Sequence, residues 1–286
     1  MPLELVPAKP EHVDEMGRIC YEAFKDIHDR HGFPPDFPST AFARMVMAGL
    51  VRREDCYVVV GIENGQPVGS NGLLIPDEVG GVGPVSVEVP AQGRGIGRAL
   101  MRDVLAHAER SGIEMVRLMQ DSFNMGSLSL YASLGFDTKD PIAMIQPAPV
   151  PCEDGSVRPV MESDLPTIDE LSRRIYKVSR RNEVASLIQP PFRPLLRERD
   201  GRVSGYFVLG MPGHGVYETE EDALALVGEA ATGVPAEFAR CFCPLTEGGL
   251  YRKLLAAGGR AIKVMNLMAL GPYEPPEGVW MPSVAY

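Results

Sequence analysis

The stretch VSVEVPAQGRGIG, residues 85–97, decides the fold of this chain. Its first part alternates apolar and polar side chains, Val85, Ser86, Val87 and Glu88, which is the pattern of a strand with one buried face. The segment after it places an apolar residue at every fourth position, which indicates an amphipathic helix. The glycines between the two predict a tight turn in which backbone N–H groups can approach a bulky anion at the start of the helix.

Three phosphate-binding patterns compete for this turn, residues 92–97. The dinucleotide-binding fingerprint needs glycine at its first, third and sixth positions, and counted from Gly93 the sixth residue is Arg98. A P-loop ends in Gly-Lys-Ser or Gly-Lys-Thr, and neither occurs here. The pattern Q/R-x-x-G-x-G of the GCN5-related N-acetyltransferases (GNATs) matches without a mismatch, so the segment resembles that family. The alternative is a strand-to-helix turn that binds no ligand.

The resemblance continues after the next expected strand, EMVRLMQ. The family has Asn, Ala or Ser, Leu-Tyr and Gly-Phe at fixed spacing on the helix that follows its fifth strand. This chain has Asn124, Ser127, Leu130, Tyr131, Gly135 and Phe136 at that spacing. The resemblance implies an α/β fold of the α+β type, in which helices flank a mixed sheet whose fourth and fifth strands splay apart. The segments HGFPPDFPS and SLSLYASLGF are similar to those of a bacterial group with two GNAT-like domains in tandem.

The resemblance also implies where the acyl donor, acetyl-CoA, would bind. Backbone groups of residues 87–89 would pair with the pantetheine arm as an additional strand does, and Asn124 would reach the arm from the other side of the gap. The glycine turn would hold the diphosphate, with Arg94 and Arg98 adding positive charge. The implied cofactor-binding residues are Val87, Glu88, Val89, Gln92, Gly93, Arg94, Gly95, Ile96, Gly97, Arg98, Asn124 and Tyr131.

Direct acetyl transfer from a thioester requires a neutral amine, a polarised carbonyl and a proton for the departing thiolate. The resemblance places Tyr131 as the acid that serves the CoA sulfur. Because an unperturbed tyrosine has a pKa of about 10, its hydroxyl is protonated at neutral pH and can donate. A backbone N–H of residues 87–89 would polarise the carbonyl. The alternative for Tyr131 is a structural role, packing with Leu130 and Phe136.

Glu88 is the first candidate for the base that deprotonates the amine, because it lies on the expected strand beside the thioester position. Equally, it could be a solvated or ion-paired strand residue. Asp121, at the end of the next expected strand, is a second candidate. The histidines at positions 28, 31 and 107 are predicted to have no catalytic role. His214 is predicted to lie in a loop, with an interdomain cleft as the alternative.

The second half of the chain repeats short blocks of the first in the same order. DEMGRICY from Asp14 matches DELSRRIY from Asp169, ENGQPVGS matches RDGRVSGY, and LYASL from Leu130 matches LYRKL from Leu250. The second half has no turn like residues 92–97 between its last two blocks. The segment GHGVYETEED precedes the expected helix there, and its carboxylates oppose the helix dipole that would attract a diphosphate.

This duplication predicts three segments. Residues 1–147 are expected to form the catalytic GNAT domain, and residues 148–157 a Pro-rich linker. Residues 158–286 are expected to form a degenerate GNAT-like domain that lacks the CoA diphosphate loop. One chain should therefore bind one CoA. The oligomeric state stays open, because an intrachain pseudo-dimer can take the place of a dimer.

Composition excludes several classes of partner. The formal net charge of -10 over 286 residues disfavours nucleic acid and anionic membranes. The chain has no apolar run of about 20 residues, and its acidic amino terminus does not resemble a secretory signal, which predicts a cytoplasmic protein. Its 5 cysteines lack metal-ligand spacing, so no metal is expected. The predicted function is acetyl transfer from acetyl-CoA to a small-molecule amine in a ternary complex. The alternative is a non-catalytic acyl-CoA-binding sensor or module.

Overall fold

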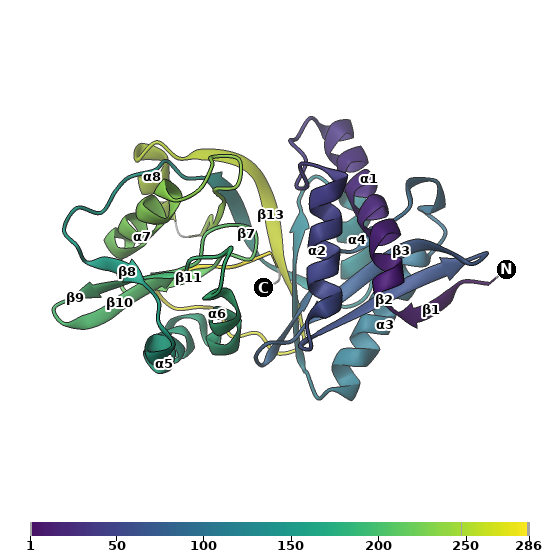
Figure 1. Cartoon of the computed structure of the whole chain (residues 1–286), viewed down its shortest axis with the longest axis horizontal. Helices are drawn as coiled ribbons and strands as arrows, with labels where there is room; N and C mark the ends of the chain where they lie inside the picture. The colour runs from purple at the N-terminus through teal and green to yellow at the C-terminus, as the bar shows by residue number, and fades with distance from the viewer. Residues whose placement is uncertain (1, 247, 285–286) are drawn as a thin grey trace. The chain divides into compact units, whose positions relative to one another are not determined.

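The computed structural model describes residues 2–246 and 248–284. The chain divides into two compact units, each with its own sheet strands and helices (Figure 1). Unit 1 consists of residues 1–118 and 123–136, and unit 2 consists of residues 119–122 and 137–286.

Unit 1 is built on a mixed sheet. Strands β1 (Glu4–Pro7), β2 (Cys56–Glu63), β3 (Gln66–Leu74) and β4 (Val79–Val82) pair antiparallel in chain order. Strand β6 (Met115–Asp121) runs parallel to β4, and that pairing ends at Gly81 and Arg117. The short β5 (Ser86–Val87) continues along β3 instead. Strands β4 and β6 therefore part, and the predicted mixed, splayed α/β sheet is confirmed.

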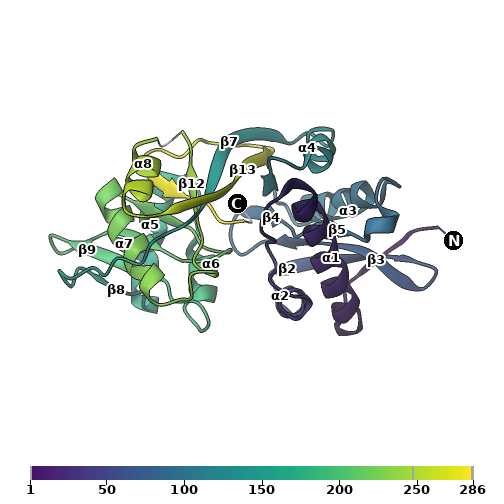
Figure 2. The ribbon, with the colours of Figure 1, turned by 90° about the horizontal axis from the view of Figure 1, so that it is seen from above.

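Helices cover both faces of this sheet. Helices α1 (Val13–His31) and α2 (Thr40–Arg52) lie on one face and α3 (Ile96–Arg110) on the other (Figures 1 and 2). Helix α4 (Met125–Ala132) follows β6, and the 3-10 turns η1 (Pro10–His12) and η2 (Val89–Ala91) precede α1 and α3. Buried side chains from α1, α2 and β2 form one core: Met16, Cys20, Met47, Val58 and Val60. Their helical and alternating spacings are the periodicities that the sequence displays.

Unit 2 contains two groups of strands. An antiparallel sheet has the order β14–β11–β10–β9–β8. Its strands are β8 (Val157–Pro159), β9 (Leu195–Arg199), β10 (Arg202–Phe207), β11 (Gly215–Tyr217) and β14 (Val279–Met281). In the second group, β7 (Asp137–Gln146) pairs antiparallel with both β12 (Cys241–Pro244) and β13 (Arg260–Leu270). The end of β6 lies beside β13, because Ser122 N–H donates to the carbonyl of Val264 at 3.1 Å.

The helices of unit 2 bury the apolar faces of both strand groups. They are η3 (Glu162–Asp164), α5 (Leu165–Tyr176), α6 (Arg181–Leu187), α7 (Glu220–Thr232) and α8 (Gly248–Ala256). The core includes Ile145 of β7, Phe207 of β10, Leu226 of α7 and Leu250 of α8, each 1% exposed or less. One continuous core thus joins the two groups of strands.

The blocks that repeat in the sequence lie on matching elements. The first pair lies on α1 and α5, and the last pair lies on α4 and α8. The middle pair forms the turns of two hairpins, β2–β3 and β9–β10. Asn64 and Gly65 have φ of 52° and 75°, and Asp200 and Gly201 have φ of 53° and 74°. Both turns therefore use the same left-handed conformations, which Asn, Asp and Gly adopt most readily.

The compact units differ from the division that the motifs suggest. The sequence assigns residues up to 147 to the first domain, whereas β7 belongs to unit 2 because its partners are β12 and β13. The expected linker, residues 148–157, is held against α7 by two hydrogen bonds. Val150 N–H donates to the carbonyl of Gly228 at 3.1 Å, and Cys152 N–H donates to Glu229 Oε2 at 2.9 Å. Pairing between segments this far apart in sequence leaves no local signal.

Candidate active site

The glycine turn of unit 1 has the backbone conformation that its sequence predicts. Gly93 and Gly95 have φ of 77° and 88°, in the left-handed region that favours glycine. Gly95 is the N-cap of α3, and its carbonyl accepts from Ala99 N–H at 3.0 Å. No side chain caps this helix start, and its first turn has no acidic residue. The first amides of α3 and its dipole thus suit an anion.

Gly97 serves a different purpose from Gly95. It lies inside α3, and a Cβ built there would contact Leu130 Cδ2 at 3.6 Å and Val87 Cγ2 at 3.7 Å. These are ordinary van der Waals distances, so an added methyl group fits. Gly95 is required for its φ angle, whereas the position of Gly97 beside α4 and β5 has room for a methyl group.

The polar side chains of the turn form hydrogen bonds and an ion pair with other residues of unit 1. Gln92 Nε2 donates to the carbonyl of Val87 at 3.1 Å, so this side chain braces the turn from within. Arg98 donates to Ser133 Oγ at 2.8 Å, and Arg94 forms an ion pair with Glu63 at 2.9 Å.

The backbone at the expected pantetheine site leaves the strand early. Val87 ends β5, and Glu88 N–H donates to the carbonyl of Val68 at 2.9 Å. Val89 begins η2, with Pro90 in the first turn of that 3-10 helix. The alternation in VSVEV predicts a longer strand, and Pro90 shortens it because proline fixes φ and favours a helix start.

The two predicted residues of α4 lie where the motif spacing puts them. Asn124 is the N-cap of this helix, and its Oδ1 accepts from Ser127 N–H at 3.1 Å. Tyr131 is 8% exposed, and its ring centroid lies 6.2 Å from that of Phe136. Both residues therefore have structural contacts in addition to the roles that the resemblance implies.

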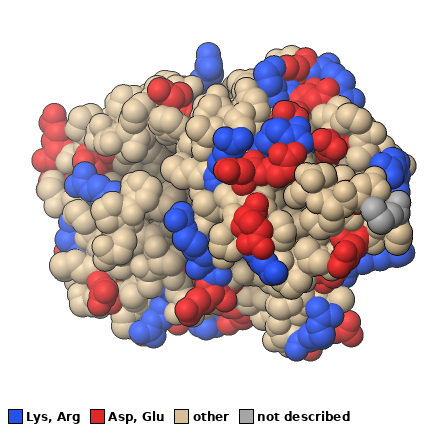
Figure 3. All heavy atoms as spheres, turned by 45° about the vertical axis from the view of Figure 1, so that its right-hand side comes forward, with Lys and Arg blue, Asp and Glu red and all other residues tan. Residues whose placement is uncertain are grey.

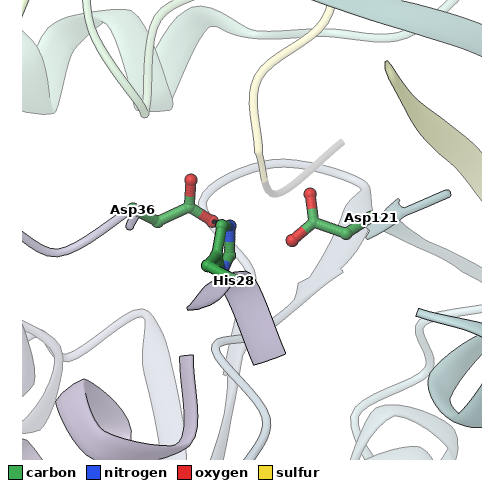
Figure 4. A group of neighbouring side chains, drawn as sticks. All are labelled: His28, Asp36 and Asp121. Atoms are coloured by element: carbon green, nitrogen blue, oxygen red, sulfur yellow. Dashed lines mark ion pairs between the residues drawn. The ribbon is translucent and has the colours of Figure 1, made fainter. Parts of the chain in front are cut away.

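Both carboxylates proposed as the base are ion-paired. Glu88 Oε1 lies 2.7 Å from Arg18 Nη2 of α1, and the same guanidinium also binds Glu15 and Glu22. The hydrogen bonds that Arg18 donates to Glu15 and Glu88 raise the pKa of Arg18. Asp121 ends β6 (Figure 4), belongs to unit 2, and lies 2.6 Å from Nζ of the buried Lys263 of the same unit.

The comparison with protein families decides the identity of this turn and helix. The family described as "Acetyltransferase (GNAT) family" matches residues 19–136. These residues form a GNAT acetyltransferase domain. The match contains the glycine turn, the splayed strands and the helix of Tyr131. It thus assigns this part of the chain to a family of CoA-dependent acyltransferases.

Curated relatives match part of the chain. An uncharacterised N-acetyltransferase of Methanocaldococcus jannaschii is 30% identical over 139 residues, which are 46% of this chain and 58% of that protein. A mycothiol acetyltransferase of Thermomonospora curvata is 40% identical over 76 residues, which are 27% of this chain and 25% of that protein. The chain therefore spans less than two thirds of the length of these relatives.

Solved structures extend the likeness in fold beyond the GNAT domain. The crystal structure of an acetyltransferase candidate from Pyrococcus horikoshii covers 99% of this chain and 95% of its own, with a TM-score of 0.79 and 16% identity. A GCN5-related N-acetyltransferase from Anabaena variabilis covers 94% of this chain and 72% of its own, with a TM-score of 0.58 and 13% identity. The likeness in fold to solved acetyltransferase structures thus extends over nearly the whole chain.

Sequence reasoning missed a buried histidine of the GNAT domain. His28 is fully buried, and its Nδ1 lies 2.7 Å from the carbonyl oxygen of Phe24. Its Nε2 lies 3.6 Å from Asp36 Oδ2, in the Pro-rich loop after α1 (Figure 4). The ring also packs edge-on against Phe123, the residue before Asn124, at 5.2 Å. The signal is the helical spacing of His28 from Phe24, which places both on the buried face of α1.

Two further histidines noted in the sequence, His107 and His214, have structural surroundings. His107 of α3 stacks on Tyr57 with ring centroids 3.8 Å apart, and desolvation lowers its pKa. His214 lies in the loop before β11, as predicted, and is 1% exposed. Burial lowers the pKa of His214 well below its ordinary value, and its Nδ1 lies 3.9 Å from Glu183 Oε2 inside unit 2.

The corresponding helix start in unit 2 is closed by its own side chains. Thr219 caps α7, and its Oγ1 accepts from Asp222 N–H at 3.2 Å. In return Asp222 Oδ2 accepts from Thr219 N–H at 3.1 Å. Asp222 is fully buried, and the guanidinium groups of Arg197 and Arg199 lie 3.4 and 3.5 Å from its carboxylate.

The strand beside that helix is also occupied. β11 of unit 2 corresponds in element order to β4 of the GNAT domain, because each follows a hairpin and precedes a long helix. One edge of β11 pairs with β10, and the other pairs with β14, where Val216 faces Trp280. Both edges of β11 are thus paired with strands of the same unit.

Surface charge agrees with the acidic composition. On the face drawn in Figure 3, basic and acidic side chains are interspersed, and no continuous basic surface is visible on the described residues there. Such a face offers no extended site for a polyanion. Over residues 2–246 and 248–284, every helix is too short or too polar to cross a bilayer.

Proposed function

We propose that this chain transfers an acetyl group from acetyl-CoA to a small-molecule amine within a ternary complex. The observation that carries the proposal is the uncapped start of α3, where Gly93 and Gly95 adopt left-handed conformations. Glycine at both positions lets backbone N–H groups turn toward a diphosphate, and the helix dipole favours its charge. A turn built only to join a strand to a helix would not need an open helix start.

The donor is expected to lie with its diphosphate on this turn and its pantetheine arm along the strand edge exposed where β4 and β6 part. Glu88 N–H is already bonded to Val68. Polarisation of the thioester carbonyl is therefore assigned to the backbone N–H of Val87 or Val89. Asn124, which begins α4, would border the arm on the opposite side.

In the proposed reaction the neutral amine attacks the thioester carbonyl and forms a carbon–nitrogen bond. The carbon–sulfur bond then breaks, and Tyr131 donates its hydroxyl proton to the departing thiolate. The amine loses a proton to a base, and solvent returns one to Tyr131. Glu88, held by Arg18, is the proposed base, acting directly or through water.

A second candidate, an acyl-CoA-binding module without turnover, is favoured by one observation. The carboxylates of Glu88 and Asp121 both have cationic partners, at 2.7 Å and 2.6 Å. A carboxylate oxygen that accepts a hydrogen bond from a guanidinium or ammonium group is less available to accept a proton from an amine. The two candidates make opposite predictions for thiol release.

The experiment is to measure free CoA thiol after mixing acetyl-CoA with polyamines, amino acids, aminoglycosides and peptide amines. An acetyltransferase releases thiol in step with one of these acceptors and yields its N-acetyl product. A sensor binds acetyl-CoA in calorimetry and releases no thiol above the uncatalysed rate with any acceptor. Mass spectrometry of the acceptor distinguishes transfer from hydrolysis.

The remaining parts of the proposal concern the whole chain. Unit 2 is proposed to support the fold or the acceptor site without binding CoA, so that the stoichiometry is one CoA per chain. The reaction is proposed to use no metal and to take place in the cytoplasm.

A further inference from the structure

A cation of the diphosphate turn is held by an acidic partner. Arg94 directly precedes Gly95, and its Nη2 lies 3.0 and 2.9 Å from the two carboxylate oxygens of Glu63. Glu63 ends β2, and the tight turn at residues 64 and 65 fixes its place beside the loop. The two residues line a hollow of about 300 Å³ between the β2–β3 hairpin and the turn.

The exposure of this pair makes it exchangeable. The side chain of Arg94 is 56% exposed and that of Glu63 is 14% exposed. Because water screens an exposed ion pair, the partners are held weakly. A phosphate group has more acceptor oxygens than a carboxylate and binds a guanidinium strongly. A phosphate placed at the start of α3 is therefore a better partner for Arg94 than Glu63 is.

The neighbouring charges do not replace Glu63 in this role. Glu88 also lines the hollow, but its carboxylate lies 2.7 Å from Arg18. The second cation of the turn, Arg98, donates to the hydroxyl of Ser133, which carries no charge. Of the two arginines of the turn, the one beside Gly95 is thus the one neutralised by a carboxylate.

We propose that Glu63 is a built-in competitor for a phosphate group of CoA, and that Arg94 exchanges the Glu63 carboxylate for that phosphate when CoA binds. This inference rests on the proposed function, because it requires CoA at the turn. The charge of Glu63 disfavours CoA binding in two ways, because it neutralises Arg94 and it repels the phosphates. Glu63 therefore lowers the affinity of the protein for CoA.

Calorimetric titration with CoA tests the exchange in the full chain. Glu63→Gln keeps the shape of the side chain and should tighten CoA binding by about 3-fold, the size expected for an exposed ion pair. Arg94→Gln should weaken binding by a similar factor. In the Arg94→Gln background, Glu63→Gln should give a smaller gain than in wild type, because only the repulsion is then relieved.

Asp55→Asn is the matched control. Asp55 lies just before β2, at the opposite end from Glu63, and pairs with Arg53 at 2.7 Å. It removes the same charge from the same unit, and CoA affinity should stay within error of wild type. An equal gain from Asp55→Asn, or an unchanged or weakened affinity in Glu63→Gln, would overturn the proposal. A gain from Glu63→Gln that is as large without Arg94 as with it would also overturn the exchange.

Titration with 3′-dephospho-CoA distinguishes the two phosphate sources. If the gain in Glu63→Gln disappears with this ligand, Arg94 exchanges to the 3′-phosphate. If the gain remains, Arg94 exchanges to the diphosphate, and either result supports the proposal. Failure of the proposed function is a different result. A protein that binds CoA but releases no thiol with any acceptor fails as an acetyltransferase while the exchange is still measured, whereas folded wild type that binds no CoA overturns both proposals.

Discussion

The starts of α3 and α7 are corresponding elements of two related units, and they differ in what satisfies their first backbone N–H groups. Helix α3 begins at Gly95 with no side-chain cap and no acidic residue in its first turn. Thr219 is the N-cap of helix α7 and forms a capping box with Asp222, in which each side chain accepts a hydrogen bond from the backbone N–H of the other residue. Three acidic residues, Glu220, Glu221 and Asp222, lie in the first turn of α7.

The difference shows that the first N–H groups of a helix either bond to a side-chain cap, which stabilises the helix, or stay available to bind an anion. A side-chain cap contributes about 1 kcal/mol to stability and removes the amides to which an anion would bind. Helix α3 of unit 1 has no such cap, so its first N–H groups can bind an anion, whereas helix α7 of unit 2 has a capping box. The following predictions test whether this contrast separates a working site from an inactive copy.

The largest expected effect is on turnover. The test compares Tyr131 of α4 with Tyr251 of α8, which stand at the same position of the two matching sequence blocks. Tyr131→Phe should lower turnover on the order of 100- to 10,000-fold, because the ring stays and the proton donor is lost. Steady-state thiol release at saturating substrates measures the effect. Tyr251→Phe changes the tyrosine of the matching block in unit 2 and should leave turnover unchanged. Equal activity of Tyr131→Phe and wild type would show that the hydroxyl is not the acid.

The next largest effect is on CoA affinity, and it tests the backbone conformation of the glycine turn. Gly95→Val should weaken CoA binding on the order of 100-fold, because a β-branched residue is strained at a φ of 88°. Gly97→Ala is the control, since its methyl group meets Leu130 and Val87 at ordinary distances and should leave affinity nearly unchanged. Calorimetry on variants with wild-type circular dichroism decides the question. Undiminished affinity in Gly95→Val would remove the diphosphate assignment.

A substitution in the capping box of α7 tests the unit 2 half of the comparison. Asp222→Ala should lower the free energy of unfolding by about 2 kcal/mol or more, because it removes the buried carboxylate that accepts hydrogen bonds from Thr219 N–H in the α7 capping box and from Ser204. Denaturant titration measures this loss. Calorimetry should still give one CoA per chain, since β14 occupies the outer edge of β11. Two CoA sites in wild type or in this variant would contradict the assignment of unit 2.

The smallest effect is on the pH dependence of stability. Hydrogen bonds from Arg174 and Arg202 lower the pKa of Glu218 from its ordinary 4.5. A depressed folded-state pKa gives stabilisation that is present above the unfolded-state value and is lost as pH falls through the folded-state value. Stability should therefore decline below about pH 4.5, and Glu218→Gln should reduce that decline by a few tenths of a kcal/mol. Denaturant midpoints at pH 3 to 7 measure it, and an unchanged slope in the variant would contradict it.

Much of the fold could be predicted because its signals are local. The glycine turn, the spacing through Asn124 and Tyr131, and the two hairpin turns each depend on a few adjacent residues with special backbone requirements. The fold confirms the mixed α/β sheet, and the likeness to solved acetyltransferase structures extends over nearly the whole chain. The division at residue 147 depends instead on which strands pair with β7, and no local pattern specifies partners more than a hundred residues away.

The surroundings of the candidate site were harder to predict for the same reason. The partners of Glu88 and Arg94 are Arg18 and Glu63, from distant parts of the chain. Asp222 illustrates a different limit. Its charge suggests repulsion of a diphosphate, whereas its position three residues after Thr219 also fits a capping box. Both interpretations exclude CoA, and the structure adds that this carboxylate is buried.

The pairing of β7 with β13 has a consequence for how the protein is made. The last residue of β7 is Gln146 and the first of β13 is Arg260, which are 260 − 146 = 114 positions apart. At a synthesis rate of about 5–20 residues per second, β7 leaves the ribosome roughly 6 to 23 s before β13 exists. β12, the other partner of β7, is made earlier, but until β13 is made the edge of β7 that pairs with it is unpaired, which invites chaperone binding or aggregation. A chain that stops after residue 149 would keep that strand in the same state permanently.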